Sequence, residues 1–296
     1  MTAYNQISAN KFRSGLLVAL FFGFVLGLCV VVSYVYDGGI GGVIFATIIA
    51  TVMALVGYYS GPRLALLTSG AHGPISVADN AYVYRLVENL AITAGLPMPK
   101  VYIINDPTPN AFATGRNPQT ASIAFTTGII ELLENEELEG VAAHELSHIK
   151  NYDTRLMTVV IICVGLVSLL AQLFLRFGGF GGSRRSKNNT GLVIAIIGLI
   201  LLIFSPLISK LIQLAVSRKR EFLADASGML LTRYPEGLAR ALEKIDQHAA
   251  PLIRANQATA HLYIANPFGH SGRKFRNWFS THPPIPDRVQ ALRSMA

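Results

Sequence analysis

The composition of this 296-residue chain excludes an ordinary soluble protein. Hydrophobic residues make up 51% of the sequence and charged residues only 14%, whereas a soluble domain carries about a quarter charged residues. The net charge of +8 would suit nucleic-acid binding, but lysine and arginine beside membrane helices explain the same excess. No aromatic and basic stripe typical of an RNA-binding surface stands out. We therefore expect a lipid bilayer, and no nucleic acid, among the partners.

Four apolar segments are each long enough to form a helix that crosses the hydrocarbon core, which takes about 20 residues. They cover residues 15–36, 40–59, 156–175 and 192–216. The first segment lacks a small-residue cleavage site, so it indicates a retained span and not a signal peptide. These segments predict a multi-pass membrane protein with four transmembrane helices.

Basic residues predict the orientation of the spans. Lys11 and Arg13 precede the first span and Arg63 follows the second, so the N-terminus and the segment after Arg63 are expected in the cytoplasm. Arg184 and Arg185 lie between spans three and four, where this topology requires the outside. Either this loop is translocated, or segments three and four form a hairpin that enters the membrane without crossing it. We favour four true spans. In both cases the residues before span three and the residues after span four lie on the same side of the membrane.

The remaining segments have the periodicities of a mixed α and β domain. Helices are expected at residues 77–94, ended by Gly95, and from Asn135 as the cap through residue 148. Helical structure is also expected from Glu221 to about His248, followed by an irregular polar part. Residues 100–105 and 121–127 are rich in strand-forming side chains, and they predict two strands.

The second of these helices contains the motif H-E-x-x-H at His144, Glu145 and His148. Helix residues four apart lie on one face, so both imidazoles can bind one Zn²⁺ at about 2.0–2.1 Å. Glu145 is then placed to take a proton from a water at the metal. The motif alone also occurs by chance, and a solvated helix with two incidental histidines is the alternative.

A catalytic zinc needs a third protein ligand and an open position for water. Glu221, directly after the fourth apolar segment, is the candidate ligand. Asp225 follows one helical turn later and could accept the outer N–H of a ligand histidine. Spacing alone leaves open that both are surface carboxylates in helix pairs, such as Glu221 with Arg218.

The segments 144–148 (HELSH), 221–225 (EFLAD) and 281–284 (THPP) occur in the order seen in HtpX-type membrane metallopeptidases, which the sequence resembles over nearly its whole length. These enzymes are relatives of the CAAX prenyl endopeptidases and the Oma-type proteases. The resemblance implies one Zn²⁺ per chain, with Glu221 as the third ligand and Asp225 as the partner of a ligand histidine. It also implies an inner-membrane metalloendopeptidase with a cytoplasmic active site, acting under stress on misfolded or damaged membrane proteins.

The expected fold is a mainly α membrane protein with four transmembrane helices and a gluzincin-like α+β peptidase domain carrying a small sheet. Two membrane hairpins interrupt the domain sequence. The expected boundaries are a cytoplasmic N-terminus at 1–14, a hairpin at 15–61, the first catalytic part at 62–155, a second hairpin at 156–216 and the second catalytic part at 217–296.

Further residues are candidates for substrate contact. His282 is expected to stabilise the oxyanion of the reaction, with Arg288 as a second candidate, although His282 could also be a structural loop residue. Residues 110–115, with Asn110 and Phe112, resemble the edge strand through which such proteases hold an extended peptide. The alternative is a turn after Pro109 that packs Phe112.

Membrane proteins and unfolded polypeptides near the bilayer are the expected substrates, and other membrane proteases are possible partners. One alternative function is a dedicated processing peptidase of membrane or lipid-modified proteins. Another is a non-catalytic zinc-binding membrane protein or a metal transporter. Structural zinc sites usually have four protein ligands, often cysteine, but Cys29 and Cys163 both lie in apolar segments.

Overall fold

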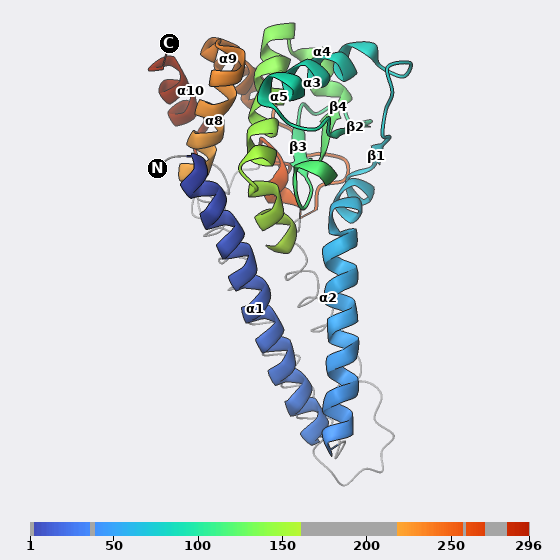
Figure 1. Cartoon of the computed structure of the whole chain (residues 1–296). Coiled ribbons are helices and arrows are strands. Elements are labelled where there is room, and N and C mark those ends of the chain that lie inside the picture. The colour runs from blue at the N-terminus through green and yellow to red at the C-terminus, as the bar shows by residue number, and fades with distance from the viewer. Residues whose placement is uncertain (1–2, 36–38, 161–217, 257–258, 270–282, 296) are drawn as a thin grey trace. The chain divides into compact units, whose positions relative to one another are not determined.

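The computed structural model describes residues 3–35, 39–160, 218–256, 259–269 and 283–295 (Figure 1). The predicted fourth span, most of the third and the basic loop between them lie outside these residues, as does His282. The chain divides into two compact units. One contains Met1–Lys11, Pro62–Thr158 and Ala215–Ala296, and the other contains Phe12–Gly61 and Val159–Leu214.

Two long helices, α1 (Ala3–Val35) and α2 (Gly39–Ser69), contain the first two predicted spans. Within the described residues, their stretches Ile7–Gly27 and Gly39–Ser69 are long and apolar enough to cross a membrane. Pro62 does not end α2, which continues for seven residues beyond it. Buried Ala65 and Leu66 in this continuation contribute packing that offsets the hydrogen bond a helical proline lacks.

The larger unit contains a four-stranded mixed sheet with the order β1-β2-β4-β3. The strands β2 and β4 are parallel, and the outer strands β1 and β3 pair antiparallel to them. The expected strands at residues 100–105 and 121–127 are thus confirmed as β2 and β4. The bounds are β1 Ala71–His72, β2 Lys100–Ile104, β3 Ala111–Thr114 and β4 Ser122–Thr126.

Local capping decides where the helices of this unit begin. The helix α3 (Ala81–Ala94) starts four residues later than expected because the Asn80 side chain accepts the Val83 N–H, and it ends at Gly95 with φ 66°. The expected cap Asn135 is instead the first residue of α5 (Asn135–Lys150). Glu134 is its N-cap, since Glu137 reaches back to accept the Glu134 N–H at 2.9 Å.

The C-terminal half supplies three helices, α8 (Arg218–Thr232), α9 (Pro235–Gln247) and α10 (Ile285–Arg293). The expected helical stretch from Glu221 to about His248 is confirmed, and it is divided into α8 and α9. Arg233 has φ 54°, and the chain restarts at Pro235. Proline has no N–H and disfavours a helical residue before it, so it serves better as the first residue of a new helix. Short helices complete the described elements: α4 (Thr127–Leu132), η1 (Pro118–Thr120) and η2 (Ala260–Leu262).

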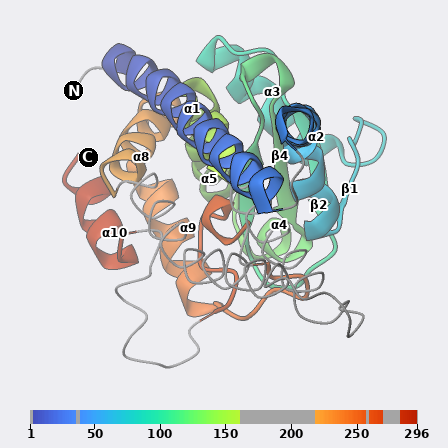
Figure 2. The same cartoon turned by 90° about the horizontal axis from the view of Figure 1, so that it is seen from below.

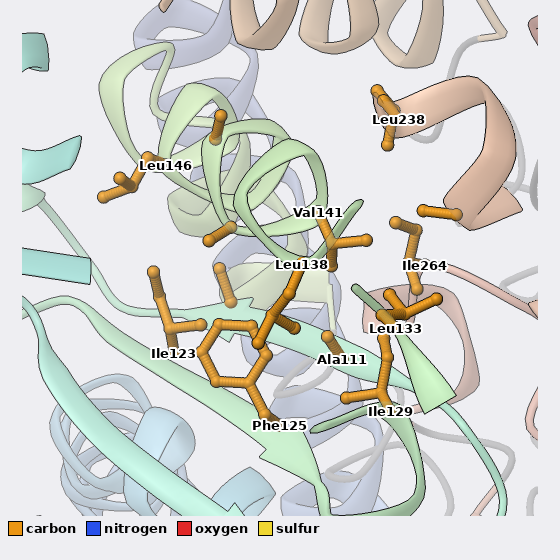
Figure 3. Close-up of a cluster of buried hydrophobic side chains, with 14 of the residues drawn as sticks. Ala111, Ile123, Phe125, Ile129, Leu133, Leu138, Val141, Leu146, Leu238 and Ile264 are labelled. Carbon is orange, nitrogen blue, oxygen red and sulfur yellow. The ribbon is translucent and has the colours of Figure 1, made fainter. Parts of the chain in front are cut away.

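The helix α5 is the centre of this unit. It contacts β3 and α3, and it packs against α8 and α9 on its other side (Figure 2). Leu138 and Val141 of α5 join Ile123 and Phe125 of β4 in one buried cluster (Figure 3). Gly140 lets α9 approach closely, since a Cβ there would lie 2.8 Å from the Leu238 nitrogen. The helix that carries H-E-x-x-H is therefore held between β3, α3, α8 and α9.

Candidate metal centre

The helix α5 holds His144, Glu145 and His148 in the interior of the unit. Their exposed fractions are 1%, 1% and 6%. The histidines are one turn apart, and their Nε2 atoms lie 3.1 Å from each other. The spacing expected from the sequence thus brings two ring nitrogens to one point.

The helix α8 brings Glu221 to the same point. Its Oε1 lies 3.6 Å from His148 Nε2, and its Oε2 lies 3.9 Å from His144 Nε2. The close approach of α8 to α5 depends on Gly228, where a Cβ would lie 3.0 Å from the His144 backbone nitrogen. Glu221 is 0% exposed, so the alternative of a surface carboxylate is wrong.

Each histidine presents its outer nitrogen to a buried carboxylate. His144 Nδ1 lies 2.9 Å from Asp225 Oδ1, and His148 Nδ1 lies 3.0 Å from Asp153 Oδ2. A neutral ring that donates Nδ1–H keeps an unprotonated Nε2. Both Nε2 lone pairs then point into the space that Glu221 also faces.

A metal cation fits this donor set. Ligand atoms at about 2.0–2.1 Å from a tetrahedral ion are about 3.3 Å apart, and the three distances between them here are 3.1, 3.6 and 3.9 Å. Two lone pairs and a carboxylate at this separation repel one another unless a metal cation or a proton lies between them. Two imidazoles with one carboxylate are the ligands of a catalytic site that keeps an open position.

Arg288 completes the surroundings of Asp225. Its Nε and one terminal nitrogen donate to the two Asp225 oxygens at 2.9 and 2.7 Å, and the arginine is 0% exposed. Burial opposes the charge on Asp225, but Arg288 and the His144 hydrogen bond outweigh it and hold the Asp225 pKa well below its usual range. Arg288 thus contacts His144 through Asp225. Its Nη1 also lies 3.9 Å from Glu221 Oε2.

Glu145 lies beside the histidines and is buried. Burial raises the pKa of its carboxyl, while the neighbouring histidines and the Ala113 backbone N–H, which donates to it, act in the opposite direction. A raised pKa makes a carboxylate a better proton acceptor near neutral pH.

Asn110 and Phe112 lie at the outer side of the sheet, next to the segment 263–265. The Asn110 side chain donates to the Ala265 carbonyl at 3.1 Å, and the Ile264 N–H donates to the Ala111 carbonyl at 2.9 Å. The Phe112 and Tyr263 rings meet edge to face, with centroids 4.9 Å apart. The segment 263–265 therefore pairs with the first residues of β3. The part of β3 that contacts Glu145 starts at Ala113, whose N–H donates to the Glu145 carboxyl.

Asp153 is a residue that sequence reasoning missed. It follows His148 by five residues, directly after the two-residue turn that ends α5, and is 1% exposed. The available signal was a carboxylate shortly after a two-histidine motif, because a ligand histidine usually donates its outer N–H to an acceptor.

Membrane-length helices together with a buried site of two histidines and a glutamate define the class of membrane metallopeptidases. A profile of peptidase family M48 matches residues 77–296. A protease HtpX homolog from Caldanaerobacter subterraneus subsp. tengcongensis is 42% identical over 298 residues, which cover 99% of this chain and 98% of that protein. A protease HtpX homolog from Tropheryma whipplei (strain Twist) is 44% identical with the same coverage. The chain therefore belongs to peptidase family M48, and it is a metalloprotease.

The fold also resembles a solved structure. Crystalline Ste24p from S. mikatae matches with a TM-score of 0.53 and 18% identity, over 97% of this chain and 66% of that one. At this identity the likeness concerns the fold alone. The expected resemblance to the HtpX type is confirmed by the two relatives.

Proposed function

We propose that this chain is a zinc-dependent endopeptidase that binds one Zn²⁺ through His144, His148 and Glu221. The observation that carries the proposal is the convergence of two Nε2 atoms, 3.1 Å apart, on a buried carboxylate. Zinc is the metal that two imidazoles and a carboxylate bind most commonly in peptidases, and it suits a four-coordinate site.

Bound zinc would supply Lewis acidity, which lowers the pKa of water and polarises a peptide carbonyl. The residues of the chain do the rest of the work. Glu145 takes a proton from the attacking water and delivers it to the leaving amine. Asp225 and Asp153 hold the two rings in the orientation that points each Nε2 inward. Arg288 keeps Asp225 ionised, and we keep His282 as the residue expected to stabilise the oxyanion.

We further propose that an extended peptide lies along β3 on the side of Glu145. Outer strands present unpaired backbone groups that can bind a peptide with little sequence preference. The end of β3 near Ala111 pairs with Ile264 and the Ala113 N–H donates to Glu145, so the peptide would pair from the Ala113 carbonyl towards Gly115. Asn110 and Phe112 then act by fixing the segment 263–265 beside the site.

The substrates we propose are cytoplasmic tails and loops of membrane proteins, including misfolded or damaged ones. His148 precedes the start of the predicted third span by only eight residues, which reach at most about 29 Å even when fully extended. This short separation supports a site near the membrane surface. We also propose four spans in the plasma membrane, with the N-terminus and both catalytic segments in the cytoplasm, as the basic residues around the first hairpin indicate.

The function is tested by zinc content and cleavage of an unfolded protein such as casein, with full-length protein in detergent. Glu145→Gln should keep zinc and lose cleavage by about 10²–10⁴-fold, because it cannot accept a proton. Glu221→Ala should lose both zinc and cleavage. Glu136→Gln, on the exposed face of the same helix, is the matched control and should behave as the wild type. Retained turnover in Glu145→Gln, or unchanged zinc in Glu221→Ala, would reject these roles.

A further inference from the structure

The turn after α5 directs Asp153 back towards the metal centre. The helix ends at Lys150, and the chain becomes helical again at residue 153. Between them Tyr152 has φ 59°, a left-handed conformation that is unfavourable for a residue with a side chain. Such a conformation persists only where surrounding contacts hold it.

The start of α1 supplies those contacts. Asn10 Nδ2 donates to the Asn151 carbonyl at 2.8 Å and to Asp153 Oδ1 at 2.7 Å. The next residue, Lys11, places its Nζ 4.4 Å from the centre of the Tyr152 ring. Asn10 is 0% exposed although it lies 143 residues away from Asp153 in the sequence. Residues 10 and 11 thus bind both residues of the turn and Asp153, which follows it.

The two oxygens of Asp153 have different partners. Oδ2 faces His148 Nδ1 at 3.0 Å, whereas Oδ1 accepts from Asn10 and lies 3.6 Å from an Arg220 guanidinium nitrogen. Arg220 carries a full charge and is only 2% exposed. Without Asn10, the carboxylate would be drawn to Arg220 and would turn away from the histidine, since a buried ion pair is stronger than a neutral hydrogen bond.

We infer that Asn10 is a positioning residue for the metal centre, acting through Asp153 on His148. The metal site is then complete only when the beginning of α1, just before the first predicted span at residues 15–36, is docked on the turn after α5. The zinc affinity would therefore depend on whether Asn10 is in contact with Asp153. This inference rests on the proposed zinc site.

The experiment measures the zinc dissociation constant of the full-length protein in detergent, by competition with a chromophoric chelator. Asn10→Ala should weaken zinc binding about tenfold, the lower end of the 10–100-fold range for residues that support ligands. Asp153→Asn should weaken it by about tenfold or more. Ser8→Ala is the matched control, because Ser8 is exposed on the same helix, and it should bind zinc as the wild type does.

The double variant decides whether Asn10 acts through Asp153. In the Asp153→Asn background, Asn10→Ala should have little further effect on the zinc dissociation constant. Fully additive losses would overturn the inference, because they show that Asn10 acts by another route. Equal zinc affinity of Asn10→Ala and the wild type would also overturn it.

A second substitution keeps the test decisive if Asn10→Ala does not accumulate. Asn10→Ser retains a donor and leaves a smaller void, so its zinc affinity should fall between those of the wild type and Asp153→Asn; wild-type affinity would overturn the inference. Wild-type protein that binds no zinc would instead reject the proposed function, which separates the two failures.

Discussion

Replacing Arg288 by alanine should damage both the fold and the metal centre. The substitution removes two hydrogen bonds, at 2.9 and 2.7 Å, from a carboxylate that is 0% exposed. Removing one partner of a buried ion pair costs about 3–5 kcal/mol, because the other charge stays buried without compensation. Asp225 still keeps its hydrogen bond with the His144 ring. We therefore expect the loss of stability to lie at the lower end of this range, about 3 kcal/mol.

This loss corresponds to a fall in the unfolding temperature of roughly 10 °C for a domain of about 200 residues. Circular dichroism during heating in detergent measures it, and chelator competition should show zinc binding weaker by about 10–100-fold. Arg288→Lys keeps a charge but cannot bind both oxygens, so it should be intermediate.

The matched control is Arg293→Ala on the same helix. Arg293 also pairs with two carboxylates, Glu236 and Glu243, but on the surface. Exposed pairs contribute little, so this variant should unfold close to the wild type and bind zinc normally. Equal effects of the two substitutions would refute the claim that Arg288 supports His144 through buried Asp225.

Two further changes test the geometry of the centre. In the metal-free protein, burial opposes the charge on His148, but Asp153 and Glu221 outweigh it and raise the His148 pKa from 6.5 to about 9. Protonated His148 therefore stabilises the metal-free fold below pH 6.5, and this contribution disappears as the pH rises through about 9. Zinc binds only the neutral ring, so the zinc affinity should rise about tenfold per pH unit between pH 6.5 and about 9. A zinc affinity that does not change with pH in this range would contradict the expectation. Gly228→Ala should push α8 away from α5, because its Cβ would lie 3.0 Å from the His144 backbone nitrogen. We expect the stability to fall by about 1–3 kcal/mol and zinc binding to weaken. Unchanged stability together with unchanged zinc affinity would count against the packing described.

The parts of the site that the sequence predicted depend on local spacing. His144 and His148 are one turn apart on any helix, so their convergence follows from the motif itself. Glu221 and Asp225 are also one turn apart, which explains why one can face the metal centre while the other faces a ring nitrogen. The strands β2 and β4 likewise follow from short runs of strand-forming residues.

The parts that the sequence did not predict depend on contacts between distant segments. Asn10 is an ordinary helix residue by its neighbours, and only the fold brings it to Asp153. Arg288 looked like a residue for substrate contact, yet its partner Asp225 lies 63 residues earlier in the chain and buries it. Helix boundaries at Glu134 and Pro235 were decided by a capping side chain and by proline sterics, which broad periodicity does not show.

X-ray absorption at the zinc edge of the purified wild-type protein tests the central claim most directly. We expect one zinc per chain, surrounded by two imidazole nitrogens and further oxygen ligands at about 2.0–2.2 Å. A sulfur neighbour at about 2.3 Å, a single imidazole, or protein without bound zinc would contradict it.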